Sequence, residues 1–300
     1  MNWITTALLS ATMQTGVSII DSHLLSRRML GLRTFMLAMS VIQVFFSLVL
    51  YLIEPWQTDV PAAAFGWVAL ATVAGTSGAL LVLFVLQKEE VSRVVPITHI
   101  SPVFVAIIAT VFLDERLEWL HWLAILIVVA GAIVITLERT APGTAVSLKK
   151  PFILLFLASL LDALGSIFTK QALEYLSFWN MYSMSILGTA IIMLSVSLRP
   201  GTLRRWRDMD RRGSTLALVT GNEIVALSAS VLYVRAVSLG PVSLVATIMG
   251  TRPVLVAVFS MLLSLVLPGF LMELPGRRTM VLRLAAILLI VGGLSIISLS

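Results

Sequence analysis

The chain has 300 residues, of which 59% are hydrophobic and 12% are charged, and its mean hydropathy is +1.02. A soluble domain carries roughly twice that share of charged residues, so the surface is predicted to face lipid. The chain has no cysteine, which excludes disulfides, thiolate metal sites and thiol nucleophiles. The net charge of +6 does not indicate nucleic-acid binding, because the basic residues cluster in loops between apolar runs.

Ten apolar runs follow one another along the chain. A membrane-spanning helix needs about 20 predominantly apolar residues. Lipid offers no hydrogen-bond partner to an unpaired backbone group, so every run is predicted to be a helix. We therefore predict an all-α membrane protein with ten transmembrane helices, near residues 4–21, 34–53, 65–86, 91–113, 119–137, 152–170, 179–198, 214–234, 242–267 and 281–298.

The fourth and ninth predicted helices share a sequence pattern. Residues 90–94, which lead to 102–106, read almost as a copy of residues 241–245, which lead to 253–257. The chain is therefore predicted to be a duplication. We place the first five-helix unit at residues 1–137, a connecting loop at 138–151 and the second unit at 152–300. An odd number of helices per unit inserts the second unit in the opposite sense, which predicts inverted repeats.

Small residues predict close helix packing in both units. Ala71, Gly75 and Ala79 are spaced four apart on the third predicted helix, where they allow a neighbouring backbone to approach. The last helices of the two units align when Gly131 is paired with Gly292.

Basic residues predict the orientation in the membrane. They are concentrated in alternate loops, and the positive-inside rule places those loops in the cytoplasm and both chain termini outside. The residues are Arg27, Arg28, Arg33, Lys88, Arg93, Arg139, Lys149, Lys150, the arginines between 199 and 212, Arg277 and Arg278.

Residues 102–131 carry a resemblance to a known family. Pro102 lies in the fourth predicted helix, residues 114–117 read Asp-Glu-Arg-Leu, and Gly131 lies late in the fifth predicted helix. This pattern resembles the EamA-type ten-helix members of the drug/metabolite transporter superfamily, whose turn reads Gly-Glu-Arg-Leu. Asp114 replaces the turn glycine, and the second copy lacks the turn glutamate. The resemblance implies a carrier for small solutes with a central cavity, in a bacterial-type plasma membrane, and favours export. It also implies cytoplasmic termini, which conflicts with the charge pattern.

Ionisable side chains inside the spans are the candidate site residues. Placing one there costs about 2.5–3.5 kcal/mol on insertion scales, so such a residue usually faces a cavity or a partner. We predict that Arg252, Asn222, Asp162 and His99 bind the solute. For His99, a hydrogen bond between helices is the alternative role. Lys170 is predicted to anchor a helix at the interface, and Asp21 is interpreted as a boundary residue.

Glu223 and Arg252 are predicted to pair between neighbouring helices. A buried ion pair offsets the cost of placing either charge in a low dielectric, and its role can be purely architectural. Alternatively, a solute competes for one partner. Glu223 is the leading candidate for proton coupling, since a buried carboxyl group is neutralised by either a cation or a proton.

Pro102 and Pro253 occupy matching places in the two units. Proline removes a backbone hydrogen bond and kinks a helix, and interruptions at matching places are typical of solute sites in transporters. We predict hinges at both prolines, with an ordinary packing kink as the alternative.

The predicted function is secondary transport of a small organic metabolite or drug by alternating access, with possible coupling to protons. Small solutes and membrane lipid are the predicted partners, and neither nucleic acid nor a cofactor is predicted. An enzyme is disfavoured because the sequence lacks a His-Glu-x-x-His pattern or a catalytic triad. A flippase for a lipid-linked intermediate and a scaffold without transport remain open.

Overall fold

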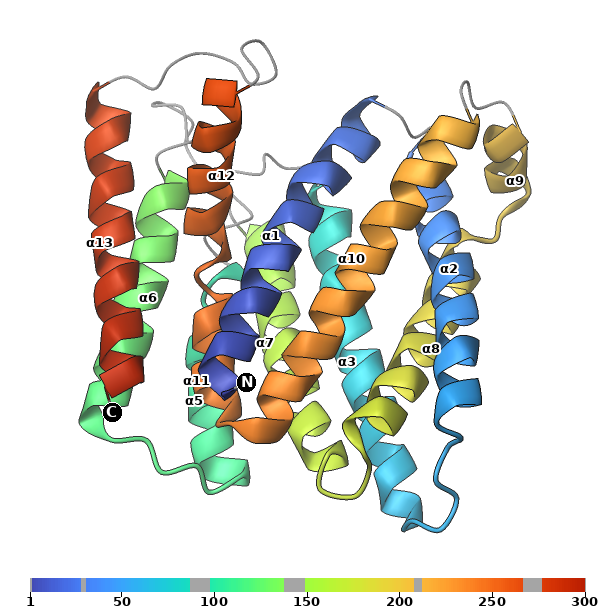
Figure 1. Cartoon of the computed structure of the whole chain (residues 1–300), viewed down its shortest axis with the longest axis horizontal. Helices are drawn as coiled ribbons and strands as arrows, with labels where there is room; N and C mark the ends of the chain where they lie inside the picture. Colours follow the sequence, from blue (N-terminus) through green and yellow to red (C-terminus); the bar gives the residue numbers. More distant parts are fainter. Residues whose placement is uncertain are drawn as a thin grey trace.

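The computed structural model describes residues 2–27, 31–86, 98–137, 149–207, 212–266 and 277–299. Helices dominate these ranges, which contain no strand, as the sequence predicts. They run side by side between two faces of the molecule, and α1 begins and α13 ends in the lower half of the view (Figure 1). In chain order the helices are α1 (Trp3–Arg27), α2 (Leu32–Ile53), α3 (Ala62–Leu86), α5 (Ser101–Phe112), α6 (Trp119–Leu137), α7 (Lys149–Ala172), α8 (Phe178–Ser197), α9 (Pro200–Arg207), α10 (Arg212–Leu239), α11 (Val242–Met249), α12 (Arg252–Val266) and α13 (Arg277–Leu299).

Seven segments of the described chain are long and apolar enough to cross a membrane, and three further apolar helices are shorter. The shorter ones lie at Ser101–Phe112, Trp119–Val134 and Leu284–Leu299. Large apolar side chains such as Phe45, Val111 and Leu288 are exposed on the outer helices. An outward apolar surface of this kind fits a lipid environment.

The ninth predicted helix is not continuous. Gly250 and Thr251 form a turn between α11 and α12, so the prediction of one helix over 242–267 was wrong. The cause is Pro253, whose ring removes the N–H that would bond the carbonyl of Met249. The chain makes the same turn at His99 and Ile100, three residues before Pro102, and α5 follows. Residues 91–97 of the fourth predicted helix lie outside the described residues.

Two boundaries also differ from the prediction. Helix α7 begins at Lys149, inside the predicted loop, because Pro151 lies in its first turn, where a missing N–H costs nothing. Residues 200–207 of the predicted polar loop form α9, which starts with Pro200 as its first residue.

Close backbone contact joins α3 to α7, and α1 packs, less extensively, against α10. A Cβ atom on Gly165 of α7 would lie 3.0 Å from the backbone nitrogen of Gly75 and 3.3 Å from the carbonyl oxygen of Ala71. The close approach predicted from Ala71 and Gly75 is therefore confirmed. A side chain at 165 would therefore require the backbone of α3 to move away by a few tenths of an ångström or more.

The last helices of the two units, α6 and α13, cross through a reciprocal pair of glycines. A Cβ on Gly131 would meet Ile290 and the carbonyl of Ala286, while a Cβ on Gly293 would meet Val128 and the carbonyl of Ala124. A Cβ on Gly292 would meet nothing within 4 Å. The residue that packs against α6 is therefore Gly293, the neighbour of the Gly292 that aligns with Gly131 in sequence, because adjacent helical positions face different directions.

Candidate functional site

A cavity of about 460 Å³ lies among helices from both halves of the chain. Its walls come from α1, α3, α5, α7, α10 and the α11–α12 turn. The volume falls in the range of roughly 300–1,000 Å³ typical of small-molecule sites. The lining residues are Gln14, Ala71, Gly75, Gly78, Ala79, Val82, Thr98, His99, Ser101, Pro102, Ala158, Ser159, Asp162, Gly165, Ser166, Thr169, Ser230, Tyr233, Ala246, Met249, Gly250 and Arg252.

Small residues on α3 and α7 make room for this cavity. Gly75 lines it, and a Cβ on Gly75 would meet nothing within 4 Å. Gly78 packs on the carbonyl of Ala158, 2.9 Å from where its own Cβ would be. The small-residue pattern therefore serves both the packing of the helices and the open space beside them.

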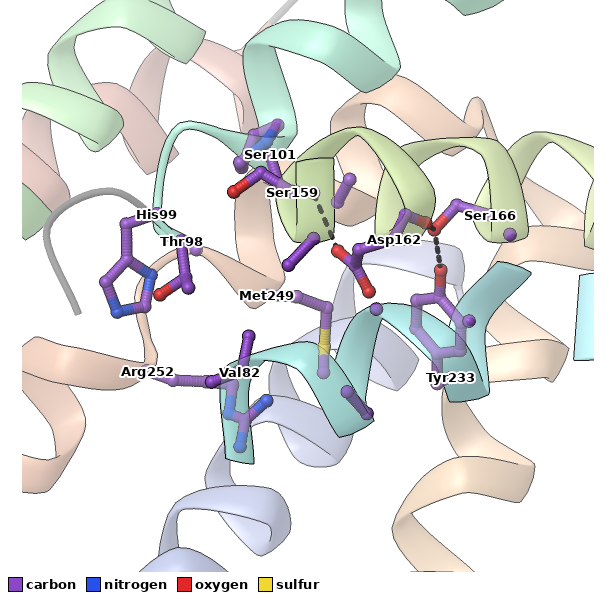
Figure 2. Close-up of a pocket in the computed structure, with 18 of the residues that line it drawn as sticks. Val82, Thr98, His99, Ser101, Ser159, Asp162, Ser166, Tyr233, Met249 and Arg252 are labelled. Carbon is purple, nitrogen blue, oxygen red and sulfur yellow. Dashed lines mark hydrogen bonds between the residues drawn. The ribbon is translucent and has the colours of Figure 1, made fainter. Parts of the chain in front are cut away.

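Asp162 is the cavity's carboxylate. It lies in the interior of α7 but is exposed, since its side chain opens onto the cavity rather than onto packed helices. Ser101 Oγ donates a hydrogen bond of 2.6 Å to Asp162 Oδ2 (Figure 2). One turn further along α7, the hydroxyl groups of Ser166 and Tyr233 are 2.9 Å apart. The second half of the chain thus supplies an acid whose remaining oxygen is available to a ligand.

Arg252 is the cavity's cation. It is the first residue of α12, immediately after the Gly250–Thr251 turn, and Nη2 donates a hydrogen bond of 3.0 Å to Ser18 Oγ. Its guanidinium group lies within electrostatic range of both Asp162 and Asp21. In Figure 2 the side chain of Met249 lies between Asp162 and Arg252, and His99 is on the side of Arg252. The predicted residues Arg252, Asp162 and His99 are therefore brought together.

Asn222 and Glu223 are not among the residues that line this cavity. They belong to a second group, here named the carboxyl–amide cluster, which consists of Asp21 of α1, Gln43 of α2, and Asn222 and Glu223 of α10. Gln43 Nε2 donates to Glu223 Oε1 at 2.9 Å, and Asn222 Nδ2 donates to Asp21 Oδ1 at 2.6 Å. Instead of the predicted pairing with each other, Glu223 binds Gln43 and Arg252 binds Ser18. The reason is that other helices provide the nearest polar groups. Gln43 of α2 lies beside Glu223, and Ser18 of α1 lies beside Arg252.

The two predicted hinge positions differ in their surroundings. Pro102 lines the cavity, and its Cγ would lie 3.3 Å from a Cβ on Gly250. The turn before α12 therefore packs directly on the start of α5. Pro253 is the second residue of α12 and follows Arg252.

A further group of polar contacts lies where α10 ends and α11 begins. Lys170 Nζ donates to the carbonyl oxygens of Val237 at 2.7 Å and Gly240 at 2.9 Å, at the end of α10. Glu115 accepts from the backbone N–H groups of Val242 at 2.6 Å and Ser243 at 3.3 Å, at the start of α11. Lys170 therefore caps a helix C-terminus and Glu115 an N-terminus.

Sequence reasoning missed several members of these sites. Asp21 was interpreted as a boundary residue, but α1 continues to Arg27, so its carboxyl group lies inside the bundle. Gln43, Ser18 and Tyr233 are uncharged, so the search for ionisable side chains inside the spans did not find them. The sequence signal that could have identified one of them is Gln43, a glutamine within an otherwise apolar span. Among the described residues, no group of His, Asp and Glu is arranged to hold a metal ion.

Comparisons with known proteins agree with this architecture. Residues 1–137 match the EamA-like transporter family. A protein of Sinorhizobium sp. described as an uncharacterized transporter in the cobO 3′ region is 30% identical over 82 residues, which are 27% of this chain and 58% of that relative. The chain thus spans just over half of that relative's length. A solved crystal structure shares 16% identity and superposes with a TM-score of 0.76 over 99% of this chain and 96% of its own, a likeness of fold alone.

Proposed function

We propose that this chain, whose residues 1–137 match the EamA-like transporter family, is a secondary transporter that moves a small organic solute by alternating access. The observation that carries the proposal is the cavity, in which Asp162 and Arg252 present opposite charges among helices of both halves. A charge in the interior of a span usually marks a solute path.

Inverted repeats are part of the proposal, and the packing supports them. The contact of α3 with α7 has its counterpart in α10 with α1 when the halves are exchanged. The reciprocal contacts of Gly131 and Gly293 are what a two-fold relation of α6 and α13 produces. We propose ten membrane-spanning helices, with α11 and α12 forming one broken span.

The solute class follows from the charges in the cavity. Arg252 suits a carboxylate or phosphate, Asp162 suits an ammonium or hydroxyl group, and His99 and Tyr233 add polar contacts. Met249, Val82 and the alanines offer an apolar wall for the rest of the solute. The cavity therefore fits a compact polar solute with both charged and apolar parts.

The broken helices suggest how access alternates. The turn before α12 packs on the start of α5 through Gly250 and Pro102, and both residues border the cavity. We propose that these two elements rock around the solute. Export is the favoured direction, with Glu223 in proton coupling and the termini outside a bacterial-type inner membrane.

Counterflow in proteoliposomes tests the proposal. A thermal-shift screen of amino acids, nucleosides, organic cations and phosphorylated intermediates selects the solute. Vesicles preloaded with that solute then exchange it for labelled solute outside. We expect exchange by the wild type and at least tenfold less by Gly75→Leu, whose side chain fills the cavity. Equal exchange by protein-free vesicles would contradict transport.

A further inference from the structure

The carboxyl–amide cluster contains two carboxyl groups outside the cavity. Glu223, Gln43 and Asn222 are only 3%, 7% and 5% exposed. Each carboxyl group accepts one hydrogen bond from an amide, Glu223 from Gln43 and Asp21 from Asn222. The bond between Gln43 and Glu223 is therefore buried, whereas the bond between Asn222 and Asp21 is partly buried.

In each pair the amide oxygen is left over. Gln43 Oε1 and Asn222 Oδ1 are buried and have no hydrogen-bond partner among the described residues. A buried acceptor without a partner costs about 1–3 kcal/mol. A carboxyl group and an amide can form two hydrogen bonds, but the second requires an O–H, which exists only when the carboxyl group is protonated. In each pair, protonation of the carboxyl group would therefore supply the donor that the amide oxygen lacks.

Among the described residues, the cluster is also short of positive charge. Asp21 and Glu223 repel each other electrostatically. The titratable side chains that face them from the packed helices are Tyr182 of α8 and Arg252 of α12, among the described residues. The Tyr182 hydroxyl donates to the carbonyl of Leu227 at 2.6 Å. Arg252 is therefore the cation that faces Asp21, and it also faces Asp162 in the cavity.

We propose that the carboxyl–amide cluster is a proton-binding site separate from the solute cavity, and that Arg252 couples the two. The inference rests on the proposed transport function and adds Asp21, Gln43 and Asn222 to Glu223. When Asp21 is ionised, its attraction for Arg252 competes with that of Asp162. When Asp21 is protonated, the guanidinium charge is available to the cavity.

The charge of the solute sets the sign of this coupling. A solute anion that binds Arg252 removes the counter-charge of Asp21, which then takes one proton from water. A solute cation beside Asp162 frees Arg252 for Asp21, which then releases one proton to water. An anionic solute therefore moves together with protons, and a cationic solute is exchanged against them.

Infrared difference spectroscopy of the protein in lipid, without solute, tests the site. Between alkaline and acidic pH, we expect the wild type to gain the C=O band of protonated carboxyl groups in an apolar environment. Asp21→Asn and Glu223→Gln should each lose part of that band and keep the wild-type elution volume. Asp59→Asn and Glu118→Gln, matched substitutions of exposed carboxylates, should keep it. A band unchanged in both cluster variants would overturn the proposal.

Two further measurements separate this site from its alternatives. In Arg252→Gln the band of Asp21 should be stronger at the same pH, and an unchanged band would refute the coupling. In Gln43→Met the frequency of the Glu223 band should shift, because the O–H loses its amide acceptor. Loss of the band on addition of sodium chloride would assign the site to a metal cation and reject the proton. No result here depends on solute movement, so absent counterflow with these bands intact would count against transport alone.

Discussion

Single charged side chains determine the character of the cavity. Asp162 could be predicted from the sequence because a carboxyl group in an apolar helix needs a reason to be there. Its partner Ser101 could not be predicted, because serine is common in helices and nothing in the spacing relates residue 101 to residue 162. Arg252 could likewise be predicted as a charge inside a span, but its partner Ser18, 234 residues earlier in the chain, could not.

Asp162→Asn should weaken the binding of solutes that carry a cationic group by about 10–100-fold. A hydrogen bond to a charged group contributes about 1.5–3 kcal/mol, and the amide keeps the shape of the side chain but not its charge. Thermal-shift titration with solutes from the screen measures the affinity. Ser101→Ala is the control and should cost less than tenfold. Equal affinities in Asp162→Asn and the wild type would show that the carboxylate does not touch the solute.

Lys170→Met should lower the free energy of unfolding by about 1–3 kcal/mol, because the carbonyl oxygens of Val237 and Gly240 lose a charged donor. The prediction of an interfacial anchor missed these bonds, since the carbonyls become available only where α10 ends. Chemical unfolding in detergent measures the change, and the exposed Arg116→Met is the control. Similar unfolding midpoints for the two variants would show that Lys170 anchors the helix at the interface and does not stabilise the end of α10.

At the scale of helices, hydropathy predicted where the chain is apolar but not where the helices break. Pro253 marked the interruption of the ninth span, yet many helices tolerate proline as a kink. Here the hydrogen bond that Pro253 removes is accompanied by a turn at Gly250 and Thr251, which packs on Pro102. That contact joins distant parts of the chain and leaves no local pattern.

The neighbouring glycines of α13 provide a matched test of helix packing. In Gly293→Ala the new Cβ would lie 2.6 Å from Cγ2 of Val128 and 3.1 Å from the carbonyl oxygen of Ala124. Overpacking of this kind costs about 1–3 kcal/mol. Gly292→Ala meets open space and should gain up to about 1 kcal/mol from helix propensity. Thermal unfolding compares the two, and equal melting temperatures would disprove the crossing of α6 and α13.

At the scale of the molecule, the repeated pattern of proline and apolar residues predicted two units. It could not predict that Gly293 rather than Gly292 contacts α6, because only the direction of the side chain distinguishes the two positions. Nor could it predict that Asn222 and Glu223 lie beside the cavity rather than in it, since this depends on which face of α10 meets α1 and α2. The sequence pattern therefore predicts where the helices are, but the rotation of each helix determines which residues line the cavity.

The absence of cysteine makes the orientation directly measurable. Asp59 lies in the connection between α2 and α3 and Arg204 in α9, at opposite faces of the molecule, and both are exposed (Figure 1). With basic loops in the cytoplasm, Asp59→Cys should react with a membrane-impermeant maleimide in intact cells. Arg204→Cys should react only after permeabilisation. The reverse pattern would place the termini in the cytoplasm.

Glu115 belongs to the first half of the chain, yet its carboxylate holds the leading amides of α11 in the second. These charge-assisted hydrogen bonds break when the two segments move apart by about 1–2 Å. Residues 113–118 and α11 must consequently travel as one body whenever this end of the protein rearranges. Any opening at this end must therefore form between other helices of the bundle.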